Sequence, residues 1–297
     1  MIKYILLLFS LFHLYCSQAQ QPGSYRPFNG KEQTLLLATG VSVTYVEQGN
    51  ENGTPVILLH GFTDSWHSFE MVLPYFSPGL HVFAITQRGH GSSGKPETGY
   101  HPKDFAADLA AFMKQKKITR AVIAGHSMGG MIAQQFTLDH PSMVKGLVIV
   151  GSDASFRDNP GVPEFSAEIN RLTDTVNYDF VHAFQQYTCA HPIDSAFYRV
   201  IIGESMKLPG RVWKAAMNGM LDVDLTGRLT EVSAPVLILW GSKDFFCTKD
   251  DQDRMKKQMP QAELVIYDDT GHSMHWEQPA KFAADLSSFI KKTARDQ

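Results

Sequence analysis

Short apolar runs alternate along the chain with longer stretches in which apolar residues recur every three or four positions. The short runs are rich in β-branched and aliphatic residues, as buried strands are, and the longer stretches are typical of amphipathic helices. This alternation predicts an α/β fold, a mostly parallel sheet whose strands are joined by crossover helices. The predicted strands span residues 34–37, 41–47, 56–60, 82–86, 121–124, 146–150, 236–240 and 263–267.

The first two predicted strands differ from the others. They flank a Thr39-Gly40 turn, so we expect them to form an antiparallel hairpin. The later strands are almost continuously apolar, as expected of strands covered by helices on both faces. Helical periodicity predicts helices over residues 102–117, from 127 to just before 140, and from about 279 onward.

The pattern changes between residues 151 and 229. Strand-like runs disappear there, and aromatic residues and methionines occur within irregular helical stretches. We interpret residues 153–225 as a helical cap inserted over the sheet, so that residues 20–152 and 226–297 form the core domain. Most of the aromatic side chains are expected to form the core of the cap, and a minority to line a substrate pocket.

The first residues carry the pattern of an export signal. A positive charge precedes an apolar stretch at residues 5–15, and small residues at 17–19 occupy the positions that a signal peptidase reads. The apolar stretch is shorter than the roughly 20 residues of a membrane-spanning helix. We therefore expect residues 1–19 to be cleaved near Ala19 and the mature protein to be periplasmic or secreted. Cys16 offers the alternative of a lipoprotein anchor, which the bulky residue before it disfavours.

Composition and charge exclude several function classes. The chain has 297 residues, of which 43% are hydrophobic, and its formal net charge is −3. No basic surplus is available to neutralise a phosphate backbone, so no nucleic acid is expected as a partner. No later stretch is apolar enough to predict a stable membrane span.

Cys189 and Cys247 pair in an oxidising compartment or remain separate thiols, an alternative that the sequence leaves open. No cysteine or histidine spacing resembles a zinc site, and neither a metal nor a cofactor is expected.

The strongest chemical signal is the sequence GHSMG at residues 125–129. It lies between the predicted strand 121–124 and a predicted helix, where a serine flanked by glycines two positions away forms a tight elbow. The serine then takes a strained backbone conformation, and its hydroxyl is held at the carboxyl end of the sheet near the positive end of the helix. We predict that Ser127 is a nucleophile.

A serine hydroxyl is a poor nucleophile near neutral pH and needs a general base. For a serine on such an elbow, the acid and the histidine are expected later in the chain and in that order. Asp244 follows the predicted strand 236–240, and His272 follows the strand 263–267, both at a carboxyl edge. His272 would take the proton of Ser127, and Asp244 would orient the imidazole. Asp153, just after the strand 146–150, is an alternative acid.

Two backbone amides are predicted to form an oxyanion hole. One belongs to Phe62, in the loop after the strand 56–60, and the other to Met128, directly after the nucleophile. The substrate pocket is predicted to contain Trp66, His126 and Phe245.

These motifs resemble the α/β-hydrolase superfamily, in its capped esterase, lactonase and haloperoxidase-like branch. The matching sequences are HGF at 60–62, QRGHGSS at 87–93, GHSMGG at 125–130, GSKD at 241–244 and GH at 271–272. The resemblance covers roughly residues 33–292 and implies an eight-stranded, mostly parallel sheet with a cap inserted after the sixth strand. Family dehalogenases and epoxide hydrolases have an aspartate at the elbow, so Ser127 argues against both. Thr86 departs from the aspartate that many relatives have before the Arg-Gly-His-Gly run.

The resemblance implies hydrolysis of a small ester or lactone through an acyl-enzyme and without a cofactor. Two other reactions use the same residues and stay open, peracid formation by a perhydrolase and cleavage of a carbon–carbon bond. A catalytically idle small-molecule receptor is a further alternative. The presence of Ser127, Asp244 and His272 together argues against it.

Overall fold

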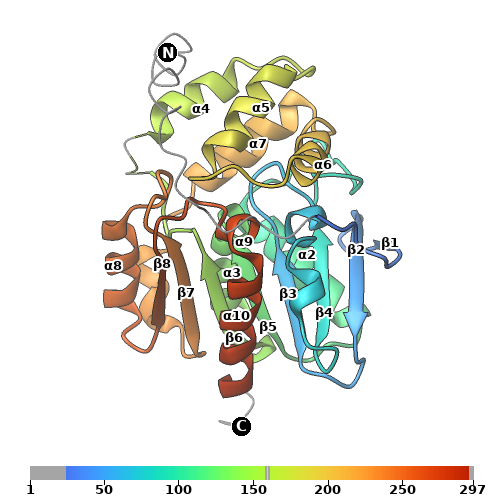
Figure 1. Ribbon diagram of the computed structural model, residues 1–297, viewed down its shortest axis with the longest axis vertical. Coiled ribbons are helices and arrows are strands. Elements are labelled where there is room, and N and C mark those ends of the chain that lie inside the picture. The colour runs from blue at the N-terminus through green and yellow to red at the C-terminus, as the bar shows by residue number, and fades with distance from the viewer. Residues whose placement is uncertain (1–24, 158, 160, 294–297) are drawn as a thin grey trace.

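The computed structural model describes residues 25–157, 159 and 161–293. Within these residues the backbone forms one eight-stranded sheet (Figure 1). Its strands are β1 (Gln33–Leu36), β2 (Ser42–Gly49), β3 (Pro55–Leu59), β4 (His81–Thr86), β5 (Ala121–His126), β6 (Val144–Val150), β7 (Val236–Gly241) and β8 (Glu263–Tyr267). The signal segment 1–19, with Cys16 and Ala19, lies outside the described residues.

The strands lie in the order β1-β2-β4-β3-β5-β6-β7-β8. β1 and β2 form the antiparallel hairpin that was predicted, and β2 is antiparallel to β4, whereas all the other neighbours are parallel. The chain leaves β3 for β4 on one side and then returns to β5 on the other side. Crevices at such a reversal, at the carboxyl ends of the strands, are where open α/β sheets bind their ligands.

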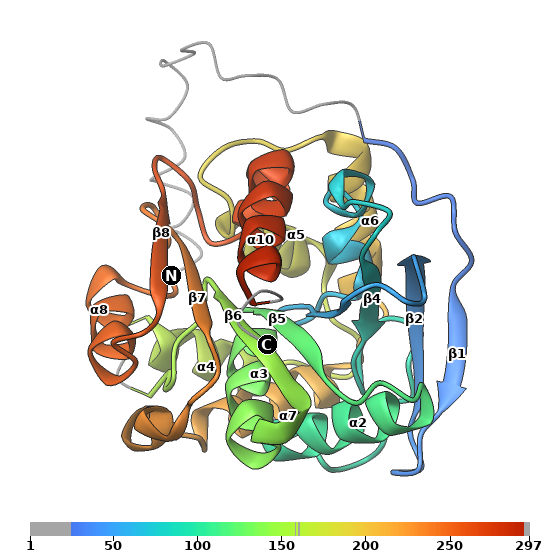
Figure 2. The same cartoon turned by 90° about the horizontal axis from the view of Figure 1, so that it is seen from below.

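Helices cover both faces of the sheet, as Figure 2 shows. Alternate side chains of each central strand point to opposite faces, so that Ile57 and Leu59 of β3 join one apolar cluster and Val56 and Leu58 join another. The first cluster also contains residues of α2 (Pro102–Gln115), α3 (Met128–Asp139) and α8 (Lys249–Gln258). The second contains residues of α10 (Pro279–Thr293), near which the short α9 (Met274–Glu277) lies.

Between β6 and β7 the chain forms a separate helical layer. It comprises α4 (Val162–Asn170), α5 (Tyr178–Tyr187), α6 (Ser195–Ser205) and α7 (Gly210–Leu221), and it lies over the carboxyl ends of the strands (Figure 1). These helices fall within residues 153–225, where the sequence predicts a cap. Trp213 and Ile169 of this layer are fully buried and belong to the same apolar cluster as α2 and α3. The layer therefore shares a continuous core with the sheet beneath it.

The predicted α/β fold is confirmed. Each predicted strand occurs within two residues of its expected bounds, and the helices predicted at 102–117, 127–139 and from about 279 correspond to α2, α3 and α10. None of the described helices is long and apolar enough to cross a bilayer. Cys189 and Cys247 are both free thiols in the structure.

A buried ion pair fastens α2 to the loop that follows β4. Arg88 donates from Nε and Nη2 to the two carboxylate oxygens of Asp108, each at 2.6 Å, and from Nη1 to the carbonyl oxygen of Gly99 at 2.8 Å. Both charged side chains are less than a tenth exposed. Removal of one partner would leave the other charge buried without compensation.

We expect Asp108→Ala to lower the free energy of unfolding by about 3–5 kcal/mol because the Arg88 guanidinium would lose its buried carboxylate. Urea denaturation measures this loss. Asp253→Ala, which breaks an exposed pair with Lys249 on α8, is the control and should cost at most about 0.5 kcal/mol. Equal small losses in the two variants would contradict the prediction.

Candidate active site

The carboxyl ends of the parallel strands gather the predicted site residues at one edge of the sheet. Phe62 follows β3, Ser127 follows β5, Asp244 follows β7 and His272 follows β8. Because β3, β5, β6, β7 and β8 are parallel neighbours, the loops after them all leave from this edge. β3 and β5 flank the reversal in strand order, so Phe62 and Ser127 follow the two strands between which open α/β sheets bind their ligands.

Ser127 has a strained backbone, with φ 52° and ψ −118°. Its amide donates to the carbonyl oxygen of Val150 at 2.9 Å, and its own carbonyl oxygen accepts from the amide of Gly130 at 2.8 Å. A Cβ on Gly125 would lie 2.0 Å from the carbonyl oxygen of Gly129, and one on Gly129 would lie 2.3 Å from that of Leu59. Only glycine fits at either position, and this close backbone contact produces the sharp turn from β5 into α3.

His272 and Asp244 form a buried pair. Nδ1 of His272 lies 2.9 Å from Oδ2 of Asp244, and the two side chains are 5% and 0% exposed. The other carboxylate oxygen of Asp244 accepts from the backbone amides of Phe246 at 2.8 Å and Cys247 at 3.0 Å. These bonds fix the carboxylate, and a carboxylate at Nδ1 leaves Nε2 of the imidazole available to take a proton.

The carboxylate of Asp153, the alternative acid, contacts other groups than His272. Its carboxylate accepts from the amide of Ala154 at 2.7 Å and lies 3.3 Å from the guanidinium of Arg254. Burial raises the pKa of the Asp153 carboxyl to about 6. Of the two candidate acids, it is Asp244 that the structure brings to His272.

Gly151 explains how the backbone leaves room for this pair. It follows β6 and has φ +47°. A Cβ there would lie 3.3 Å from both Oδ2 of Asp244 and Nδ1 of His272 and 2.9 Å from the carbonyl oxygen of His272. A larger residue at position 151 would therefore clash with both Asp244 and His272. Sequence reasoning missed Gly151, although its place directly after the strand 146–150 was visible.

His126 joins the elbow to the loop of His272. The two rings lie 4.7 Å apart between centroids, and Nε2 of His126 donates to the backbone carbonyl of His272 at 3.1 Å. Burial holds the pKa of His126 well below its usual range, so its ring is neutral.

The Ser127 hydroxyl itself makes no hydrogen bond to any described residue, and the residue is partly exposed. Such contacts often form only when substrate is bound.

The two predicted oxyanion donors are both unengaged. Met128 is the first residue of α3, where a backbone N–H has no partner within the helix. Phe62 lies in the loop between β3 and the 3-10 helix η2 (Trp66–Phe69). Among the described residues, neither amide donates a hydrogen bond to another protein group. Both N–H groups therefore remain available to a developing negative charge.

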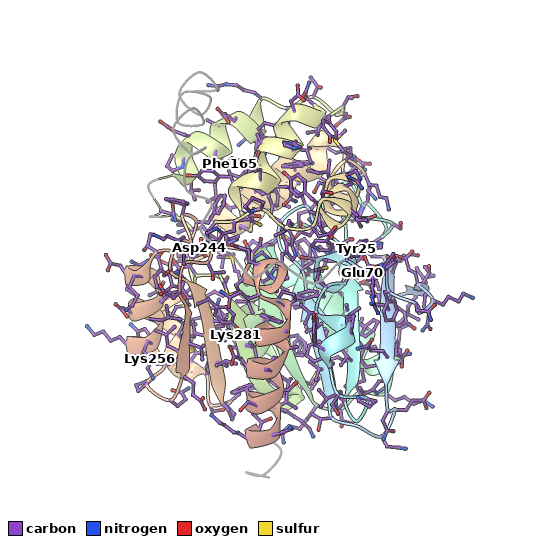
Figure 3. The ribbon with its side chains drawn as sticks, viewed as in Figure 1. Tyr25, Glu70, Phe165, Asp244, Lys256 and Lys281 are labelled. Atoms are coloured by element: carbon purple, nitrogen blue, oxygen red, sulfur yellow. The ribbon has the colours of Figure 1, made fainter. Side chains whose placement is uncertain are left out.

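Aromatic side chains from the helical layer pack against this edge of the sheet. The ring of Phe246 lies 4.9 Å from that of His272, and Phe184 lies 6.3 Å from Phe246 and 6.0 Å from Phe62. Phe165 stacks on Phe184 at 5.2 Å, and Figure 3 shows it in the layer that lies over Asp244. The surroundings of His272 and Phe62 on this side are therefore apolar.

The three predicted pocket residues occupy different environments. His126 is buried beside His272, as described above. Phe245 is 66% exposed, and its ring stacks on Tyr187 at 5.5 Å. Trp66 belongs to the apolar cluster on the α10 face, and its indole N–H donates to Glu32.

The chain before β1 also packs on Trp66. Its ring lies 5.8 Å from Phe28, whose amide donates to the carboxylate of Glu70. Tyr25 donates to the same carboxylate at 2.8 Å, and Figure 3 shows these two side chains together. Trp66 therefore packs this segment against the sheet, and it belongs to a different apolar cluster from Phe62.

One group of possible metal ligands occurs in the described residues, at the acid–base pair itself. One ligand atom each of Asp244, Cys247 and His272 lies within 4.8 Å of the other two. Burial raises the pKa of the Cys247 thiol well above its usual value, and the thiol donates to the carbonyl oxygen of Gly151 at 3.4 Å. A neutral thiol is a poor metal ligand, and both oxygens of Asp244 are already hydrogen-bonded. These features favour the acid–base pair over a metal site.

Comparison with known proteins places this geometry in a family. The sequence pattern of the Alpha/beta hydrolase family matches residues 56–285. The solved structure of Est816, described as an N-acyl homoserine lactone degrading enzyme, is 30% identical, with a TM-score of 0.71 and coverage of 84% of this chain and 97% of that one. The esterase RhEst1 from Rhodococcus sp. ECU1013 is 26% identical, with a TM-score of 0.79 and coverage of 88% and 98%.

Curated relatives extend the range of named reactions. A 2-hydroxy-6-oxononadienedioate/2-hydroxy-6-oxononatrienedioate hydrolase from Burkholderia vietnamiensis is 27% identical over 281 residues, which cover 86% of this chain and 96% of the relative. The family pattern spans most of the sheet, the helical layer and every predicted catalytic position. The chain therefore belongs to the alpha/beta hydrolase family.

Proposed function

We propose that the protein is a serine hydrolase that cleaves a small ester or lactone. The buried pair of His272 and Asp244, beside a strained elbow that carries Ser127, is the observation that carries this proposal. The free amides of Phe62 and Met128 supply the remaining component, a place for the oxyanion. Similarity to an esterase and to a lactone-degrading enzyme supports the choice of bond.

The reaction proceeds in two steps. Oγ of Ser127 attacks the carbonyl carbon as its proton passes to Nε2 of His272, and the oxyanion is stabilised by the two amides. The bond to the alcohol oxygen then breaks, and that oxygen takes the proton from His272. For a lactone, the alcohol stays attached to the acyl group. Water then gives a proton to His272 and attacks the acyl-enzyme, and His272 passes that proton to Oγ of Ser127 as the acid leaves.

The apolar surroundings favour an uncharged acyl or ring portion. Phe62, Phe184 and Phe246 offer rings and no charge to a bound substrate. A dicarboxylate would need cationic side chains to replace its hydration, and burial of an unpaired charge is costly. This observation favours an ester or lactone over cleavage of a carbon–carbon bond in a charged diketo acid.

The perhydrolase alternative shares the acyl-enzyme and differs only in what attacks it. Hydrogen peroxide in place of water would release a peracid. The amounts of acid and peracid formed from one acetate ester with peroxide present separate the two reactions, and the geometry of the described residues favours neither nucleophile.

Ser127→Ala should abolish hydrolysis of p-nitrophenyl esters and lactones, with a loss of about 10⁴–10⁶ in turnover, because no other group can form the acyl-enzyme. Steady-state assays over a panel of acyl esters and lactones measure this, and the preferred member identifies the substrate class. Ser92→Ala, which alters an exposed serine, is the control and should leave turnover unchanged. Equal activity in wild type and Ser127→Ala would refute the nucleophile, and an inactive wild type would favour the receptor or the carbon–carbon alternative.

Asp244→Asn should lower kcat by about 10⁴ because the amide would favour the wrong tautomer of His272. Asp153→Asn, at the alternative acid, should keep kcat within about threefold since its carboxylate does not reach the histidine. Initial rates per folded molecule compare the two variants. A larger loss in Asp153→Asn would reverse the assignment.

The exposed ring pair of Tyr187 and Phe245 adjoins the site through Phe246. The ring of Phe246 lies 5.5 Å from Tyr187 and 4.9 Å from His272. We propose that these rings contact the distal part of a long acyl chain as it reaches the serine. Apolar area covered in this way contributes about 25 cal/mol per Å².

Phe245→Ala should therefore reduce kcat/KM for p-nitrophenyl decanoate by about tenfold and leave that for the acetate ester unchanged. Tyr75→Ala removes another exposed aromatic ring, away from this edge, and serves as the control. An equal effect on the two esters would show that the ring does not contact the acyl chain.

A further inference from the structure

The loop that carries Phe62 has a conformation that its own sequence disfavours. Thr63, directly after Phe62, has φ +68°. A β-branched residue in this region is a true outlier, with a cost of about 1–3 kcal/mol, and it persists only where the surroundings enforce it. Thr63 is bonded directly to Phe62, so a restraint on the backbone of Thr63 also restricts the backbone of Phe62. Contacts that hold Thr63 in place therefore also place one oxyanion donor.

Those contacts come from the helical layer. Nε2 of Gln185, on α5, lies 2.9 Å from Oδ1 of Asp64, 2.9 Å from Oγ of Ser205 on α6, and 3.3 Å from Oγ1 of Thr63. The hydroxyls of Thr63 and Ser205 are themselves 3.2 Å apart. All of these side chains are at most 2% exposed. One amide group thus joins two helices of the layer to two consecutive residues of the loop.

Asp64 completes the network, and its side-chain hydrogen bonds come from neutral donors. Its second carboxylate oxygen accepts from Oγ of Ser68 at 3.0 Å, and that hydroxyl also lies 3.0 Å from Nε2 of His275. Burial raises the pKa of the Asp64 carboxyl to about 7. A buried carboxyl that relies on neutral donors depends strongly on each of them, because loss of one leaves a costly unsatisfied oxygen.

The other side of the loop is confined as well. A Cβ on Gly61 would lie 2.7 Å from Nδ1 of His126 and 3.4 Å from Oδ2 of Asp64. Gly61 therefore lies between the elbow and Asp64 with no room for a side chain. The loop is therefore confined at Gly61 by His126 of β5, and its next residues, Thr63 and Asp64, are held by Gln185.

We propose that Gln185 and Asp64 form a latch between α5 and the loop after β3, and that this latch positions the Phe62 amide for the oxyanion. Gln185 and Asp64 are positioning residues, since they act through the backbone and touch no reacting atom. The inference rests on the proposed function for its effect on rate. The latch itself is a property of the loop and can be measured without any substrate.

Two measurements on Gln185→Leu test the latch. Leucine keeps much of the volume and removes both N–H donors. Hydrogen exchange in a peptide that covers residues 58–66 should become at least tenfold faster, and kcat for p-nitrophenyl acetate should fall 10- to 100-fold with KM within threefold. A fall in kcat with an almost unchanged KM indicates loss of an interaction made in the transition state.

Gln252→Leu is the matched control. Gln252 is also a fully buried helical glutamine, but its amide donates to the carbonyl oxygen of Ser152 and, among the described residues, makes no hydrogen bond to the loop after β3. This variant should lose stability and keep both the exchange rate of residues 58–66 and kcat within twofold of wild type. If Gln185→Leu behaves in the same way, the network is only structural and the latch is refuted.

Variants of Asp64 provide a second route if Gln185→Leu does not fold. Asp64→Ala should lower kcat 10- to 100-fold. Asp64→Asn should restore kcat to within about threefold of wild type, because its carbonyl oxygen still accepts from Gln185. Equal losses in both variants would mean that the charge matters and would overturn the latch. An inactive wild type would refute the proposed function, and the exchange rates of the same proteins would still decide whether the latch exists.

Discussion

The site depends on backbone segments that approach each other too closely for any side chain. At the elbow, the end of β5 packs directly on the first turn of α3, and the start of α3 packs on the end of β3. Gly125 and Gly129 allow this approach, and Ser127 between them accepts a backbone conformation that serine rarely adopts. Backbone packing therefore brings Ser127 and Met128 next to the end of β3, which the loop of Phe62 follows. The buried pair of Asp244 and His272 lies beside this elbow, where His126 contacts the loop of His272.

The positions of Asp244 and His272 also depend on a close backbone approach that only glycine allows. Gly151 lets the end of β6 pass within van der Waals contact of Asp244 and His272. The carboxylate is then held by backbone amides on one side and by the imidazole on the other. Because the pair is buried, its interaction is little weakened by solvent. A rigid carboxylate in such surroundings fixes both the tautomer and the orientation of the histidine.

The helical layer contributes in two physically different ways. Its aromatic rings make the approach to His272 apolar, and they end in an exposed pair, Tyr187 and Phe245, at the surface. Its polar contribution is concentrated in Gln185, which reaches the strained loop at Thr63. Strain of this kind near a reacting group is held by the rest of the structure. The helical layer therefore contacts both the loop of Phe62 and the surroundings of His272.

The sequence by itself determined the alternation of strands and helices, the hairpin before β4 and the insertion of helices after β6, because apolar periodicity and turn residues are local properties. It also singled out Ser127, Asp244 and His272, since loops at the carboxyl ends of parallel strands must share one edge. Only the tertiary structure decided between Asp153 and Asp244, placed Trp66 and Phe62 in different apolar clusters, and joined Gln185 to Asp64 across 121 residues of chain. These contacts depend on side-chain directions and on packing between distant segments. No local pattern in the sequence records such long-range contacts.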